Sequence, residues 1–229
     1  MTKQPSNRAR KADPDPHRRI LAAAARVFAS RGFEGARVDE IAEQAGINKA
    51  MLYYHVGDKE RLYSAVLVES IDRALSLLRA ATSQAASPSA KLQAVLDALA
   101  EFGTSNPEFI PIVMREVASG GQTLPPEISL RLGAVFRVVA DVLAEGVAQG
   151  VFRPTDPLLT HVALVGALMY LRAAHPIRQR VARAAGLPVV AHTPGELALH
   201  VGNLFLHGLE AAPAAPAKAV HVRRKGGSR

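Results

Sequence analysis

Residues 38–62 constrain this chain more than any other stretch, because they hold the pattern of two short helices joined by a tight turn. Apolar residues at i, i+3, i+4 and i+7 predict one buried stripe on the first helix: Val38, Ile41, Ala42 and Ala45. Gly46 follows and is free to adopt the positive φ that ends a helix. Asn48 is a typical N-cap for a second helix, so the spacing predicts a helix-turn-helix unit.

The second helix of this unit has two unlike faces. At about 100° per residue, Leu52 and Val56 lie on the side that can face the first helix. Ala50, Tyr53 and Tyr54 lie on the outer side, which leaves two tyrosine rings in water. Against DNA these residues are useful, because a tyrosine hydroxyl can bond a phosphate oxygen or a base edge and an alanine permits close approach to a thymine methyl. The pattern therefore predicts a surface that binds double-stranded DNA.

A third helix of the unit is expected to begin near Lys59. Asp58 precedes it as a probable N-cap. The first backbone N–H groups of such a helix, together with the positive end of its dipole, form a natural phosphate site. This helix start therefore belongs to the same predicted DNA-binding surface.

The run GINKAMLYYHVGDKERL resembles the recognition-helix signature of the TetR family of bacterial transcriptional regulators, and RRILAAAARVFASRGFEGARVDEIAEQA before it is similar to that family too. The resemblance covers about residues 18–67. It implies a three-helix DNA-binding domain, a helical ligand-binding and dimerisation domain behind it, and repression relieved by a small molecule. By position, it implies DNA contacts at seven residues: Lys49, Ala50, Met51, Tyr53, Tyr54, His55 and Lys59.

Two positions depart from the family pattern. Arg37 stands where the family usually has Ser or Thr, so the first motif helix gives up a side-chain cap and gains a cation for phosphate. Val56 stands where the family usually has Phe, which predicts looser packing. We include Arg37 and the N-cap Asn48 in the candidate DNA-binding surface.

Composition excludes several classes of protein. The chain has 48% hydrophobic residues, enough for a sizeable core, and no cysteine, so disulfides and thiolate metal sites are excluded. No apolar stretch near the N-terminus resembles a signal peptide. The longest apolar run, residues 158–171, is 14 residues long and too short to span a bilayer, so it predicts a buried helix. We expect a bacterial cytoplasmic protein, at the nucleoid when bound to DNA, with no membrane partner.

The positive charge is concentrated at the two ends of the chain. Residues 1–62 hold 12 Lys/Arg against 8 Asp/Glu, residues 63–210 hold 11 against 12, and residues 211–229 hold five basic and no acidic residues. This division fits a DNA-binding end joined to a domain with another task, although basic residues that merely keep a protein soluble give the same balance. Residues 1–17 and 211–229 are expected to be a disordered basic arm and a disordered basic tail.

The fold is predicted to be all-α, with a DNA-binding domain over residues 18–64 and a ligand-binding and dimerisation domain over residues 65–210. No convincing strand pattern occurs. The expected helices beyond the motif are 60–82, 91–103, 108–118, 127–149, 157–174 and 194–210, with 176–193 a loop or a short helix. Helix 60–82 spans about 30 Å and forms the mechanical link between the domains.

The last two expected helices, 157–174 and 194–210, are apolar nearly all round and carry small residues. Such helices need cover on both sides, and a second subunit can supply it. The resemblance implies a homodimer through an intersubunit four-helix bundle. The alternative is a pair of ordinary core helices in a monomer.

The sequence offers no catalytic motif, and we expect that the protein is not an enzyme and needs no cofactor. It has no phosphate loop, nucleophile elbow or HExxH pair. His161, His200 and His207 make a metal site conceivable, but scattered helical histidines are more often core or interface residues. An apolar ligand cavity is a further hypothesis, with Arg115 or Glu116 as polar anchor, although plain core packing suits the same residues. The candidate lining is Phe102, Phe109, Met114, Arg115, Phe136, Met169 and Tyr170.

These observations favour a homodimeric repressor that reads a pseudo-palindromic operator and is released by an unidentified small molecule. Activation instead of repression remains open, because the direction of regulation depends on where the operator lies relative to a promoter. The alternative is a DNA-associated architectural protein that uses its basic ends without choosing sequences, which predicts steeply salt-dependent binding. A helical enzyme with an incidental helix-turn-helix is a third hypothesis, but it requires a catalytic constellation that the sequence does not offer.

Overall fold

The computed structural model describes residues 15–211, and within them it contains helices and no strand apart from an isolated bridge between Phe152 and Glu210. This confirms the predicted all-α fold. Nearly all of the expected arm and tail lie outside the described residues. The helices are α1 (Pro16–Gly35), α2 (Val38–Ala45), α3 (Lys49–Val56), α4 (Lys59–Gln84), α5 (Pro88–Ser105), α6 (Phe109–Ala118), α7 (Pro126–Ala148), α8 (Pro157–Ala173), α9 (His175–Ala184) and α10 (Pro194–Leu209).

The helix-turn-helix forms as its caps predict. Gly46 ends α2 with φ 68°, in the left-handed region. Asn48 caps α3 by accepting a 2.8 Å hydrogen bond from the Met51 backbone N–H. Asp58 caps α4 in the same way, accepting from the Arg61 backbone N–H at 2.8 Å. Local side-chain chemistry therefore sets both helix starts at the predicted DNA-binding surface.

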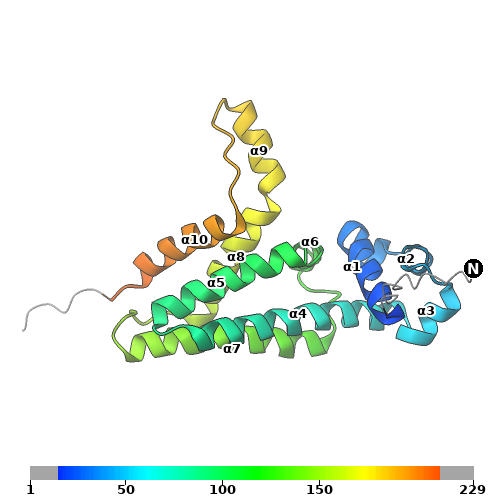
Figure 1. Cartoon of the computed structure of the whole chain (residues 1–229), viewed down its shortest axis with the longest axis horizontal. Coiled ribbons are helices and arrows are strands. Elements are labelled where there is room, and N and C mark those ends of the chain that lie inside the picture. Colours follow the sequence, from blue (N-terminus) through cyan, green and yellow to red (C-terminus); the bar gives the residue numbers. More distant parts are fainter. Residues whose placement is uncertain (1–14, 212–229) are drawn as a thin grey trace, which may run out of the picture.

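The buried apolar residues form two cores, and α4 contributes to both. The first core joins α1 to α4 with α6 and the start of α7, and from α4 it takes Leu62, Tyr63, Val66, Leu67 and Ile71. The second core joins α5, α7, α8 and α10 to the far end of α4, where Leu78 is buried. With 26 residues, α4 is about 39 Å long. Figure 1 shows it running from the DNA-binding end into the rest of the molecule, as the predicted link between the two.

Several boundaries differ from the sequence prediction for local reasons. α1 continues to Gly35 past a kink at Gly32, where φ is 72°. α5 begins at Pro88, three residues earlier than expected, because Ser87 caps it and a proline suits the first helical turn. In the region left open between loop and short helix, α9 forms a helix and a loop leads on to α10.

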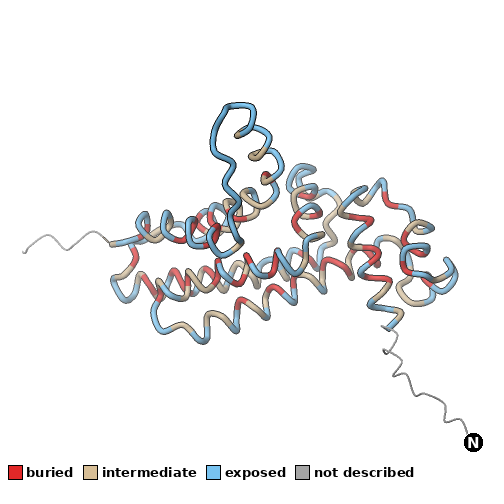
Figure 2. The backbone as a smooth tube through the Cα atoms, turned by 45° about the horizontal axis from the view of Figure 1, so that its top comes forward, coloured by how far each residue is buried: buried red, intermediate tan, exposed pale blue. Residues whose placement is uncertain are grey.

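The expectation of a buried helix at residues 158–171 is only half right. Leu164 and Leu168 are buried, whereas Leu159 is 68% exposed and Val162 is 59% exposed. The cause is the arrangement of α8, which rests with one side on the second core and leaves the other uncovered. Figure 2 shows that the segment after α8, which projects from the rest of the molecule, is mostly exposed. No single described helix is long and apolar enough to cross a membrane, although α8 and α9 together, bent by 62°, meet the criteria of length and composition.

Candidate nucleic-acid interface

The α3 helix turns its two predicted faces to different surroundings. Leu52 is fully buried in the first core, and Val56 packs against that core while half-buried. Tyr54 is 84% exposed and Tyr53 44% exposed. Ala50 and Met51 are exposed beside them. The outer face therefore offers two phenols, a thioether and a methyl group to a partner.

Lys49 opens α3 with an ion pair across the helix-turn-helix. Its ammonium lies 2.9 Å from Asp39 Oδ1 on α2, and both side chains are mostly exposed. The hydrogen bond to Asp39, followed by the charge of that carboxylate, raises the pKa of Lys49 above its usual value. The ammonium is therefore positive at neutral pH, and because exposed pairs are weak it can exchange Asp39 for a phosphate.

His55 and Lys59 are less open than the resemblance implies. His55 is half-buried, with its ring 5.4 Å from that of Tyr54 in an edge contact, and its Nε2 is buried without a hydrogen-bond partner in the described part of the chain. The Lys59 ammonium lies 4.4 Å from the centre of the Phe33 ring and donates long hydrogen bonds to the carbonyls of Glu34 and Ala36. Lys59 thus connects the start of α4 to the end of α1.

Arg37 is exposed at the start of α2 and makes no side-chain capping bond, as its departure from the family pattern predicts. Within residues 15–211 its guanidinium has no ion pair. It is therefore available to a phosphate.

Consecutive residues of α6 connect the helical domain to two helices of the DNA-binding unit. Arg115 donates from Nη2 to the Ser30 carbonyl at 2.9 Å, near the α1 kink. Glu116 is buried, and its Oε1 accepts a 2.5 Å hydrogen bond from the hydroxyl of Tyr63 on α4. The two predicted polar anchors of a ligand cavity thus face the DNA-binding unit. Sequence reasoning missed Tyr63, whose only signal is a phenol at a buried stripe position, where its hydroxyl needs a partner.

The remaining cavity candidates are dispersed over the helical domain. Phe102 and Phe109 make an edge contact at 5.2 Å, and Phe136 makes another with His161 at 5.5 Å. Met114 and Met169 are half-buried, and Tyr170 is 67% exposed. Burial lowers the pKa of His161 below its usual value. Among residues 15–211, no group of three His, Cys, Asp or Glu side chains is placed to hold a metal ion.

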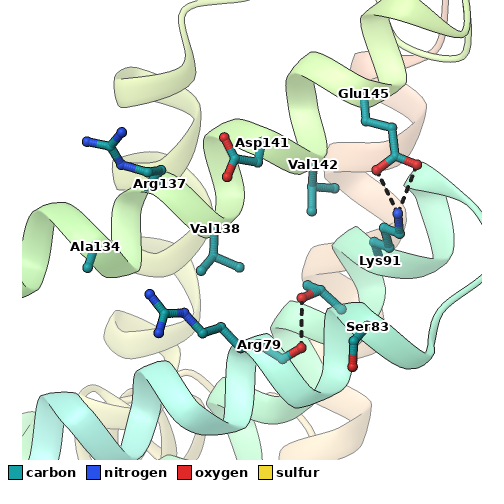
Figure 3. A pocket seen from close by; sticks show the side chains of 10 residues that line it. Arg79, Ser83, Lys91, Ala134, Arg137, Val138, Asp141, Val142 and Glu145 are labelled. Carbon is teal, nitrogen blue, oxygen red and sulfur yellow. Dashed lines mark hydrogen bonds and ion pairs between the residues drawn. The ribbon is translucent and has the colours of Figure 1, made fainter.

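A groove of about 460 Å³ lies elsewhere in the helical domain, at the end of α4 away from α3 (Figure 3). We call it the distal groove. None of the seven predicted cavity residues lines it. Its walls come from α4, the start of α5 and α7, and they consist of Arg79, Thr82, Ser83, Lys91, Ala134, Arg137, Val138, Asp141, Val142 and Glu145.

Two family profiles match this chain. Residues 20–66 match "Bacterial regulatory proteins, tetR family", and residues 88–184 match "Tetracyclin repressor-like, C-terminal domain". The first spans α2 and α3 with most of α1 and the start of α4, and the second runs from the start of α5 to the end of α9.

Relatives and solved structures agree with these profiles. The chain is 32% identical over 151 residues to the HTH-type transcriptional repressor NicS of Pseudomonas putida, which covers 64% of this chain and 69% of NicS. It is 33% identical over 138 residues to the HTH-type transcriptional regulator RutR of Escherichia coli K12, covering 60% of this chain and 65% of RutR. The crystal structure of AibR in complex with isovaleryl coenzyme A and operator DNA superposes with a TM-score of 0.65 at 23% identity, covering 86% of this chain and 98% of AibR. On its motif, its fold and these matches, the chain belongs to the TetR family of bacterial transcriptional regulators.

Proposed function

We propose that this regulator is a homodimeric repressor that places α3 of each subunit in a major groove of a pseudo-palindromic operator and leaves it when a small molecule binds. One observation carries the proposal. On a helix of eight residues, Leu52 is fully buried while Tyr54 is 84% exposed, so α3 is fixed by its inner face and offers its outer face to a partner. Two half-sites at least one helical turn apart, about 34 Å, match a two-fold dimer.

The α3 residues divide into two proposed roles. Tyr53, Tyr54 and the cations Lys49 and Arg37 bind phosphate oxygens, which fixes the position of the helix on any sequence. Ala50 and Met51 lie on the outer face with short or apolar side chains and contact base edges. Asn48 caps α3, and His55 and Lys59 complete the proposed DNA-binding surface beside it.

We assign dimerisation to α8 and α10. Large apolar side chains remain exposed on both helices, and the family offers a second subunit as their cover. The exposed aliphatic side chains among them are Leu158, Leu159 and Val162 on α8 and Leu199 and Leu204 on α10. A second subunit packed over these side chains would remove this set of exposed apolar groups from water.

The small molecule acts through the helical domain. AibR, a protein of the same fold, was crystallised with isovaleryl coenzyme A and operator DNA together, which supports a division between a ligand site and a DNA-binding surface. A ligand that binds one arrangement of the helices better shifts the population toward it. α4 and α6 carry the shift to the DNA-binding unit, because α4 contributes to both cores and α6 bonds to α1 and α4. The lining predicted from the sequence remains Phe102, Phe109, Met114, Arg115, Phe136, Met169 and Tyr170.

The remaining assignments complete the proposal. The DNA-binding domain covers residues 18–64 and the ligand-binding and dimerisation domain residues 65–210. The regulator works in the bacterial cytoplasm and catalyses no reaction. The chain outside residues 15–211 adds basic charge that strengthens binding to any DNA.

Selection of bound duplexes from a random pool tests this function. The purified full chain is expected to enrich an inverted repeat whose half-sites are spaced by about one helical turn. The control is the Tyr53→Ala, Tyr54→Ala double variant, which keeps Leu52, the α3 caps and the proposed base readers, and should bind the enriched repeat more weakly because it loses two phosphate contacts. A pool without enrichment by the unaltered protein would favour an architectural protein, whose basic ends bind without choosing sequences.

A further inference from the structure

We propose that the distal groove is a binding site for an amphipathic molecule with an apolar chain and one anionic group, a carboxylate or a phosphate ester. The proposal rests on the charge, the lining and the volume of this groove. Only its consequence for DNA binding rests on the proposed function above.

The charges around the groove do not cancel. Lys91 and Glu145 neutralise each other in an ion pair of 2.6 Å between α5 and α7, both side chains being largely shielded from water. Arg79 on α4 and Arg137 on α7 have no ion pair within residues 15–211, and neither has Asp141. Two such guanidinium groups against one carboxylate leave one positive charge, which a single anionic group balances.

Nearer the DNA-binding unit, the charges of the same two helices, α4 and α7, are paired. There Arg131 of α7 lies 3.1 Å from Asp72 of α4, so an arginine faces an acid across the helix pair. Two turns further along α4, the residue on the side of Asp72 is Arg79. The groove is therefore lined by an arginine from each helix, Arg79 of α4 and Arg137 of α7. Both arginines are exposed, and a guanidinium pairs well with carboxylate or phosphate oxygens, so an anion in the groove could be bound by both.

The floor of the groove is apolar. Val142 is buried, and Ala134 and Val138 are half-buried on the same face of α7. A hydrocarbon chain laid on them removes apolar surface from water. The volume of about 460 Å³ falls within the range of small-molecule sites, roughly 300–1,000 Å³.

The two ends of the groove carry different charged groups. Figure 3 shows the Lys91–Glu145 pair at one end and the two arginines toward the other. The acidic group therefore binds at Arg79 and Arg137, and the chain extends over Val138 and Val142 toward the ion pair. A ligand in this pose touches α4 and α7 together and so biases the far end of the helix that begins at the DNA-binding surface.

Calorimetric titration of the full chain with decanoate, decyl phosphate and decanol tests the site. At least one of the two anions is expected to bind at least tenfold more tightly than decanol, which has the same chain and no charge. The tighter anion identifies the preferred head group. Equal affinity for decanol, or no binding of either anion, would overturn the proposal.

Variants locate the site. Arg79→Gln and Arg137→Gln should each weaken binding of the preferred anion about tenfold, the effect of losing one charge-assisted contact. Arg180→Gln is the matched control, because Arg180 is an exposed arginine on α9 outside the groove. Ala134→Phe keeps every charge but fills the floor, and should weaken binding as well. Equal affinities in Arg79→Gln and Arg180→Gln, with circular dichroism showing both folded, would contradict the assignment.

A parallel titration of the protein–operator complex separates this proposal from the proposed function. Loss of DNA binding with the anion in the unaltered protein but not in Arg79→Gln would support the groove as the effector site. Failure to bind any operator would contradict the repressor function while the calorimetric result for the groove stands. Calorimetric binding that leaves the operator complex intact would overturn the regulatory consequence and retain the site.

Discussion

The hydroxyl of Tyr63 on α4 lies 2.5 Å from Glu116 Oε1 on α6 and donates a hydrogen bond to it. Thr123, on the loop after α6, donates to the same oxygen. Glu116 is 5% exposed, and its Oε2 has no partner in the described part of the chain. Burial, followed by the bond to Glu116, raises the pKa of Tyr63 above its usual value, so the phenol remains a donor at neutral pH. The Glu116 carboxylate thus depends on two hydroxyl groups from different elements.

Removal of the Tyr63 hydroxyl should destabilise the protein. In Tyr63→Phe the buried carboxylate keeps only Thr123 as donor, and we expect the free energy of unfolding to fall by about 1–3 kcal/mol. Urea denaturation followed by circular dichroism measures it. Tyr53→Phe is the control, since Tyr53 lies on the exposed face of α3 and should change stability by less than about 0.5 kcal/mol. Equal losses in the two variants would refute the role given to Glu116.

The two roles on α3 predict different kinds of loss in DNA binding. Tyr53→Ala should weaken binding to operator and random DNA in similar proportion, by about 1–3 kcal/mol on each, because a phosphate contact is independent of sequence. Met51→Ala and Ala50→Ser should instead change which base is preferred at one position of the half-site. Competition binding with a set of single-base operator variants distinguishes them. A uniform loss from all three substitutions would rule out the proposed base readers.

A charge on the exposed side of α8 should prevent dimerisation. Val162→Glu places a carboxylate in the proposed subunit interface, where it would be buried without a partner, so we expect a monomer by analytical ultracentrifugation. Operator affinity should fall with it, because one half-site alone is then bound. Leu130→Glu is the control, as Leu130 on α7 is 80% exposed outside that face. If both variants sediment like the unaltered protein, α8 is not the interface.

Two glycines of α7 should respond oppositely to substitution by alanine. A Cβ at Gly146 would overlap the buried Phe152 ring, so Gly146→Ala should cost about 1–3 kcal/mol by overpacking. A Cβ at Gly133 meets nothing within 4 Å, so Gly133→Ala should stabilise the helix by about 0.5–1 kcal/mol. Thermal unfolding of the two variants measures both changes in stability. A stabilised Gly146→Ala would show that Phe152 does not fill the space above Gly146.

Local chemistry explains which features the sequence could predict. Gly46, Asn48 and Asp58 act on their own neighbouring backbone groups, so the helix-turn-helix could be read residue by residue. The periodicity around Leu52 likewise predicted which side of α3 is buried.

The sequence pattern could not predict contacts between elements that are distant in the chain. Periodicity tells which face of a helix is apolar, but it does not identify the neighbour that a polar side chain meets. For this reason the contact between Lys59 and Phe33 was not predicted, while the expected contact of Lys59 with phosphate stays a prediction. Arg115 and Glu116, expected as ligand anchors, bond to α1 and α4. The distal groove escaped prediction because its arginines are far apart in the chain and line one groove only when α4 packs on α7.

The most direct test of the central claim is the affinity of the purified protein for the DNA flanking its own gene, compared with random DNA of equal length at two salt concentrations. If α3 reads an operator there, the specific complex should be roughly a thousandfold or more tighter than the random one. The affinity for the specific duplex should remain higher than that for random DNA at the higher salt concentration, where phosphate contacts weaken for both duplexes. Equal affinity for the two duplexes, lost together as salt rises, would contradict a sequence-specific repressor of its own gene and favour binding through basic charge alone.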